Sequence, residues 1–215
     1  MSVITLAGSQ TRSSSLASDI IRRVRQKLNE SSAHFWSDEE LLQWINEGCL
    51  DIAAKTLCVG ASEEIMLAAD TLEYALTSPH LTAIAAVYDN RKGLMRGDPR
   101  QVGHVRDVGE PVHWYPWDGF VGVYPVPAGG SPAIGRRVRI YLVDMPAQLA
   151  AADPIPTPAI FDGPLVNYVC AEAWFKDDKA GKGSYRLSLY EGVIAQFRAD
   201  FGDRGRDRPA DLGSK

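Results

Sequence analysis

Residues 35–56, FWSDEELLQWINEGCLDIAAKT, predict a helix with a well-defined start and a single apolar stripe. Ser37 can cap the first turn, and Glu40, three residues later, can bond back to the Ser37 amide. No residue in this stretch forms a catalytic pair, so it is typical of an assembly helix rather than a reactive one. The apolar side chains recur at helical spacing, at Leu41, Leu42, Ile45, Cys49, Ile52 and Ala53.

A second amphipathic helix is expected just upstream, starting at Ser18. Its basic residues Arg22, Arg23, Arg25 and Lys27 surround an apolar side. Residues 29–33 break the pattern. Two amphipathic helices joined by so short a link are expected to lie antiparallel and to bury their apolar sides together. The apolar side consists of Ile20, Ile21, Val24 and Leu28.

Short runs of β-branched and aromatic residues separated by turn residues follow Gly60, and they predict strands. The clearest hairpin has His113–Tyr115 entering a turn at Trp117-Asp118-Gly119 and residues 120–124 leaving it. Pro116 and Pro125 each lack a backbone donor, which favours edge positions. The strand candidates are 64–67, 72–76, 83–88, 112–115, 120–124 and 137–143.

The pattern becomes helical again after a proline-punctuated link at residues 153–158. We expect Asp162 to cap one helix and Ser184 to cap the next, with residues 178–183 as the loop between them. The first stripe contains Leu165, Val166, Val169, Cys170, Ala173 and Trp174, and the second contains Leu187, Tyr190, Ile194, Phe197 and Phe201.

These patterns predict an α+β fold, in which the N-terminal and C-terminal helix pairs form one helical bundle with a small antiparallel β domain inserted between them. The expected parts are a flexible N-terminal arm at 1–17, the bundle at 18–59 and 158–201, a β-rich insertion at 60–152, and a C-terminal tail at 202–215.

Composition argues against a protein whose main work is binding phosphate backbones, because the 215 residues carry a formal net charge of −4. The sequence predicts no membrane span and no secretory signal, so we expect a soluble protein made inside the cell. We expect its three cysteines to be buried free thiols, because they form no CxxC pair. They are Cys49, Cys58 and Cys170.

The search for catalytic and ligand motifs predicts no catalytic residue, no metal site and no cofactor. The four histidines lie in dissimilar segments, at His34, His80, His104 and His113. Residues 180–184, AGKGS, precede a helical pattern but lack the phosphate-loop spacing, so a helix connection is favoured. An unrecognised hydrolase stays a further alternative, since triad members can lie far apart in sequence.

The aromatic run from His113 to Trp117, together with Phe120 and Tyr124, allows another class of function. Such side chains can stack on sugars or single-stranded nucleic acid, which would make the protein a carbohydrate- or nucleic-acid-binding module. Strand aromatics more often pack in a core or a subunit interface, and the flanking charges here are mixed.

The C-terminal tail alternates in charge and has two possible interpretations: a solvated end, or a peptide that docks on a partner. In the second interpretation its arginines meet carboxylates and a leucine supplies an apolar anchor. The docking residues would be Arg204, Arg206, Arg208 and Leu212.

Two helical segments resemble a known family. WSDEELLQWINEGCLDIAAKT at 36–56, preceded by DIIRRVRQKLNE, resembles the start of the head-to-tail adaptor (connector) proteins of tailed bacteriophages. YVCAEAWFKDD at 168–178, followed by YEG at 190–192 and FRADF at 197–201, resembles the C-terminal helical hairpin of the same proteins.

The resemblance implies a structural virion protein without enzymatic activity, in a ring of about twelve copies at the neck between head and tail. Its partners would be further copies of itself, the portal protein and the next neck or tail protein, and DNA would pass through the lumen without specific binding. The tail would reach the portal. Another neck or tail-completing ring protein is the alternative. The polar face of the helix predicted within residues 35–56 has three open interpretations: it contacts another subunit, lines the channel or is simply solvated. Its residues are Glu40, Gln43, Glu47 and Asp51.

Overall fold

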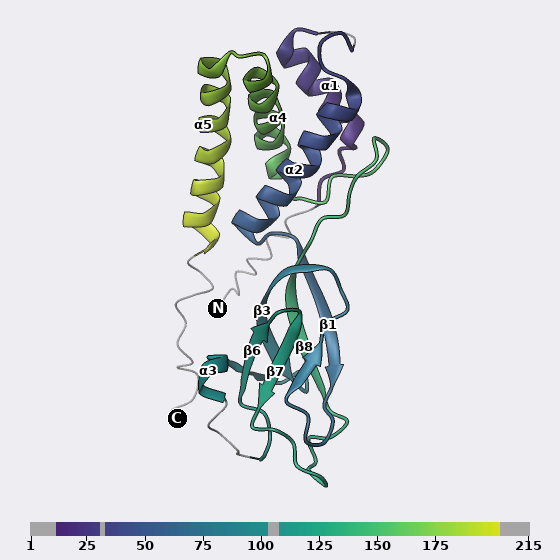
Figure 1. The fold of residues 1–215 in the computed structure, drawn as a ribbon, viewed down its shortest axis with the longest axis vertical. Helices are drawn as coiled ribbons and strands as arrows, with labels where there is room; N and C mark the ends of the chain where they lie inside the picture. The colour runs from purple at the N-terminus through teal and green to yellow at the C-terminus, as the bar shows by residue number, and fades with distance from the viewer. Residues whose placement is uncertain (1–11, 31–32, 103–107, 203–215) are drawn as a thin grey trace, which may run out of the picture. The chain divides into compact units, whose positions relative to one another are not determined.

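A computed structural model describes residues 12–30, 33–102 and 108–202. The chain divides into two compact units, a helical unit of Met1–Val59 with Pro146–Lys215 and a β-rich unit of Gly60–Met145. Within the described ranges the structure has four helices of 12 to 19 residues and two sheets (Figure 1), so the predicted α+β class is confirmed.

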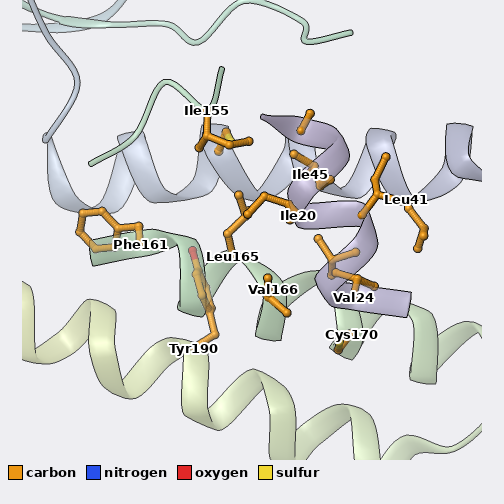
Figure 2. Packing of buried hydrophobic residues seen from close by; sticks show 14 of the residues in the cluster. Ile20, Val24, Leu41, Ile45, Ile155, Phe161, Leu165, Val166, Cys170 and Tyr190 are labelled. Atoms are coloured by element: carbon orange, nitrogen blue, oxygen red, sulfur yellow. The ribbon is translucent and has the colours of Figure 1, made fainter. Parts of the chain in front are cut away.

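The four long helices share one hydrophobic core. It is drawn in Figure 2, where Ile20, Ile45, Leu165 and Tyr190 come from four different helices. A short 3-10 turn at Ala159–Phe161 leads into the third of these helices, and a π-helical turn at Arg198–Gly202 follows the fourth. The helices are α1 (Ala17–Leu28), α2 (Asp38–Thr56), α4 (Asp162–Lys176) and α5 (Ala180–Phe197).

The predicted start of α2 is confirmed. The Glu40 amide donates to Ser37 Oγ at 3.1 Å, and the Ser37 amide donates to Glu40 Oε2 at 3.1 Å. Leu57 ends the helix in the left-handed region, at φ 55°. The two hydrogen bonds between Ser37 and Glu40 satisfy two amides at the helix start that have no partner within the helix.

Arg25 was assigned to the polar side of α1, but its side chain is buried. Its guanidinium donates to the Trp36 carbonyl at 2.9 Å, to Glu30 at 2.8 Å and to Asp38 at 3.1 Å. The pairing compensates for the cost of removing the charge from water. Arg25 therefore ties the end of α1 to the start of α2.

The described part of the expected N-terminal arm is bound within the chain rather than free. The Ser13 amide donates to the Thr157 carbonyl at 3.0 Å, and the Ile155 amide donates to the Ser15 carbonyl at 2.9 Å. The hydroxyls of Ser13 and Ser15 donate to Asp162 Oδ2 at 2.9 and 2.7 Å. Residues 12–16 thus lie along the proline-punctuated link that precedes α4.

The residues predicted to cap the starts of the two C-terminal helices are both wrong. Asp162 is the first helical residue of α4, and its carboxylate accepts hydrogen bonds from the two serines rather than from its own helix. Helix α5 begins at Ala180, so Ser184 lies inside it. The early start packs Gly183 against Phe175, where an added Cβ would lie 2.6 Å from the ring. The expected loop shrinks to Asp177–Lys179.

The β-rich unit contains two four-stranded sheets in the described ranges, ordered β1-β8-β3-β4 and β2-β7-β6-β5. Each of the six predicted strands is present. The two-residue strands β4 and β5 and the short helix α3 (Pro99–Val102) were not predicted. The strands are β1 (Gly60–Met66), β2 (Glu73–Ala75), β3 (His80–Tyr88), β4 (Lys92–Gly93), β5 (Met95–Arg96), β6 (His113–Trp117), β7 (Phe120–Tyr124) and β8 (Arg137–Asp144).

The pairing is antiparallel except between β5 and β6, which run parallel. The expectation of a wholly antiparallel β domain is therefore wrong at this edge. A parallel pair needs a long connection, and residues 97–112 separate β5 from β6 in the sequence. In the β6–β7 hairpin, Trp117 pairs with Phe120 across Asp118 and Gly119, both at positive φ. Pro116 lies beyond the two β6 residues that pair with β5. At Pro116, β6 therefore pairs with β7 alone among the described strands, and no hydrogen bond to β5 is lost through the missing backbone donor.

Candidate functional site

The described residues contain no group of three or more histidine, cysteine, aspartate or glutamate side chains that could hold a metal ion. His34 is exposed ahead of α2, His80 Nδ1 lies 2.7 Å from the Ser78 carbonyl oxygen, and His113 stacks on Tyr124 with ring centroids 4.9 Å apart. His104 lies outside the described ranges. The three described histidines thus lie in separate local settings.

Glycine-rich residues 180–184 form the first turn of α5. Two neighbouring lysines instead contact an aromatic ring: Nζ of Lys179 and Nζ of Lys182 lie 5.1 and 4.5 Å from the centroid of the Trp174 ring. The segment is therefore the packed start of α5, and the connection expected there lies one step earlier, at Asp177–Lys179.

The β6–β7 aromatics do not form one continuous platform. Trp114 is only 1% exposed and belongs to the core of the β-rich unit, and Tyr115 is buried with its hydroxyl donating to Glu73 at 2.9 Å. Only Trp117 and Phe120, at 60% and 43% exposure, turn outward at the hairpin tip. Burial leaves Trp114 and Tyr115 no free face for a ligand, so the stacking-module hypothesis keeps only part of the aromatic run on which it rested.

The predicted polar face of α2 separates into engaged and free residues. Glu40 pairs with Lys176 of α4, and hydrogen bonds from Lys176 and the Ser37 amide lower the pKa of the Glu40 carboxyl. Asp51 accepts a hydrogen bond from Tyr190 of α5 and lies 2.8 Å from Lys55 Nζ. Gln43 and Glu47 are exposed and bond only to each other, at 2.9 Å, in the described part of the chain.

An acidic cluster, Glu47, Asp51 and Glu172, acts on Tyr168, where α2 packs on α4. A Cβ added at Gly48 would lie 2.9 Å from the Tyr168 ring, which places the helices in close contact there. Glu172 lies one turn beyond Tyr168. Burial and then the charge of Glu47 raise the pKa of Glu172, while burial and the charges of Glu172, Glu47 and Asp51 raise the pKa of Tyr168 to about 12. The charge of Glu47 on α2 therefore disfavours the ionised form of Glu172 on α4.

Two open grooves flank α2 within the helical unit. One, of about 960 Å³, runs between α1 and the start of α2 and includes Arg22, Gln26 and Glu39 in its lining. The other, of about 440 Å³, lies between Gln43, Glu47 and Leu50 and residues 146–149. These grooves and the acidic cluster are typical of surfaces that bind other proteins rather than of an enclosed catalytic pocket.

The family comparison decides the class of protein. A family model described as SU10 adaptor protein matches residues 15–213. The chain belongs to this family of phage head-to-tail adaptors. The adaptor is thus a phage structural protein and a virion component, which confirms the resemblance found in its helices. A comparison with curated proteins gave no match.

In this adaptor, no helix within the described ranges is long and apolar enough to cross a membrane. The predicted docking residues Arg204, Arg206, Arg208 and Leu212 lie outside the described ranges. Sequence patterns did not predict that Tyr168 and Glu172 of α4 would lie next to the polar face of α2. Glu172 stands next to the apolar stripe of its own helix, and only the packing of α4 on α2 brings it near Glu47.

Proposed function

We propose that this protein is a head-to-tail adaptor that forms a ring, joins the portal to the neck or tail, and continues the DNA channel. The observation that carries the proposal is the family match over residues 15–213, which spans both the N-terminal and the C-terminal helices. In this proposal a ring of about twelve copies lies at the neck of the virion and has no enzymatic role.

The shared helical core supports an assembly role. Helices from both ends of the chain pack into one core, so a single unit can present different surfaces on its different sides. A closed ring needs two complementary patches on each subunit. We propose that the helical unit is a bundle that builds the ring and that the β-rich insertion faces one of the other neck components.

The charge of the chain suits a channel through which DNA passes. At a formal net charge of −4, the protein lacks the concentrated positive charge that would hold phosphates and slow a moving genome. We therefore propose that DNA crosses the lumen without specific binding.

Electron microscopy of the purified adaptor mixed with portal rings of the same phage tests the proposal. The expected result is a ring of adaptor subunits seated on the portal. An adaptor that stays monomeric with and without the portal would refute the ring. A ring that ignores the portal but joins another neck or tail protein would favour the alternative of a different neck or tail-completing component.

The C-terminal tail is the proposed portal contact, through Arg204, Arg206, Arg208 and Leu212. Removing residues 203–215 should leave the thermal midpoint of unfolding nearly unchanged, because the tail follows the last core helix. The same deletion should weaken binding to portal rings, measured by co-sedimentation. Equal binding by the full and shortened chains would exclude the tail as the contact.

A further inference from the structure

Two cations converge on one uncharged side chain where α1, α4 and α5 meet. Lys27 Nζ of α1 and Arg186 Nη1 of α5 donate to the same oxygen, Oδ1 of Asn167 on α4, at 3.2 and 3.3 Å. In the part of the chain that the structure describes, neither cation lies within 4.0 Å of a carboxylate. We call Lys27 and Arg186 the basic pair.

The acidic counterpart is on the α2 side of the same unit. Glu47 precedes Gly48, which packs against the Tyr168 ring, and Glu172 lies one turn beyond Tyr168 on α4; no described lysine, arginine or histidine nitrogen lies within 4.0 Å of either carboxylate. We call Glu47 and Glu172 the acidic pair. Two like charges without a counterion favour a partner that brings positive charge.

The two pairs lie on different faces of the helical unit. Asn167 and Glu172 are five residues apart on α4, and at 3.6 residues per turn their side chains leave the helix axis about 140° apart. The basic pair bridges α4 to α1 and α5, whereas the acidic pair bridges α4 to α2. One subunit therefore presents two separate patches of opposite charge.

We propose that the acidic pair of one subunit docks on the basic pair of the next copy around the ring. The inference rests on the proposed ring and names the surface that builds it. Because the patches differ and lie on different faces, the contact is head to tail, and repeating it by rotation closes a ring. Charge complementarity of this kind fixes register and rejects wrong pairings.

Charge swapping tests the contact through assembly of the full chain, with sedimentation velocity and electron microscopy as readouts. The acidic-face variant is Glu47→Lys with Glu172→Lys, and the basic-face variant is Lys27→Glu with Arg186→Glu. Each variant alone sets like charges against each other, so its self-association should weaken about tenfold or more. An equal mixture should assemble again, because reversed faces meet reversed faces and native faces meet native faces.

A matched control reverses two exposed acidic residues of the β-rich unit, Asp98→Lys with Glu110→Lys, and should assemble like the wild type. Neutral variants, Glu47→Gln with Glu172→Gln and Lys27→Gln with Arg186→Gln, cover the case in which a reversal prevents folding. They should weaken assembly and reduce its dependence on salt, because fewer charges remain to be screened.

The outcomes distinguish failure of the proposed contact from failure of the proposed ring. If the wild type forms rings and both reversed variants also form them, or if the mixture gives no recovery, the proposed contact is wrong and the ring stands. A wild type that stays monomeric even with portal rings overturns both. If the acidic-face variant weakens assembly only while residues 203–215 are present, the arginine-bearing tail covers the acidic pair and the contact between copies is again wrong.

Discussion

The hydroxyl of Tyr190 on α5 donates a hydrogen bond to the carboxylate of Asp51 on α2, 139 residues away in the chain. Lys55 contacts the same carboxylate at 2.8 Å, and the Tyr168 ring packs edge-on against Tyr190 with centroids 5.3 Å apart. Asp51 is therefore a joint between the N-terminal and C-terminal helices. Its neighbour Glu47, one turn earlier, is exposed and bonds only Gln43 among the described residues.

Removing the Tyr190 hydroxyl should loosen this joint. Tyr190→Phe keeps the buried ring but leaves Asp51 one donor short, so we expect the free energy of unfolding to fall by about 1–2 kcal/mol. Urea denaturation followed by circular dichroism measures the loss. Tyr185→Phe, on an exposed ring of the same helix, is the control and should change nothing measurable.

The capping box predicts a difference between two serines. Ser37→Ala removes the acceptor for the Glu40 amide and should destabilise the protein by about 1 kcal/mol. Ser184→Ala replaces an exposed serine inside α5 and should be neutral within about 0.5 kcal/mol. Thermal unfolding of the two variants compares them. Equal losses would mean that Ser184 is a cap after all.

Close packing of α2 on α4 depends on the missing side chain of Gly48. In Gly48→Ala the new Cβ would lie 2.6 Å from Leu165 Cδ1, so the helices must shift and we expect a loss of about 1–3 kcal/mol. Gly192→Ala on α5, where a Cβ meets nothing within 4 Å, should instead stabilise the protein by up to about 1 kcal/mol. Urea midpoints of the two variants should move in opposite directions.

Glu63 should make the β-rich unit sensitive to acid. Burial disfavours its charged form, but hydrogen bonds from the amides of Ser78 and Thr77 and from the Thr77 hydroxyl outweigh burial and lower the pKa of Glu63 to about 2. A depressed pKa in the folded state means that the ionised carboxylate stabilises the fold above the unfolded value of 4.5. That contribution disappears as pH falls from about 4.5 to about 2.

The test is the free energy of unfolding measured between pH 7 and pH 2 for the wild type and for Glu63→Gln. The variant carries no titrating group at this site, so the difference between the two proteins should shrink below pH 4.5. A difference that stays constant over the whole range would show that the ionisation of Glu63 does not stabilise the fold.

Features set by neighbouring residues were predictable. The reciprocal bonds of Ser37 and Glu40, the apolar stripe from Leu41 to Ala53 and the two-residue turn at Asp118-Gly119 depend on residues a few positions apart. The helix start, its buried side and the place of the hairpin turn were therefore available from spacing alone, whereas the pairing of Trp117 with Phe120 inside the hairpin was not predicted. The short strands β4 and β5 were not, because two-residue strands carry no period.

Features set by distant residues were not predictable. Arg25 looks like one more surface charge on α1, yet it is buried because Trp36 and Asp38 meet it there. Asp162 looks like a helix cap, yet Ser13 and Ser15 use its carboxylate from 147 to 149 residues away. In both cases a side chain with several possible partners received the one that folding brought near.

The sequence by itself determined the class of the longer helices and strands, the start of α2 and the resemblance to phage adaptors, because helical period, capping and family motifs are local patterns. Only the tertiary structure decided which charges are already paired. Glu40 and Asp51 find Lys176 and Tyr190 on other helices, while Glu47, Glu172, Lys27 and Arg186 find no opposite charge among the described residues. Pairing depends on proximity in space, which helical spacing within one segment does not contain.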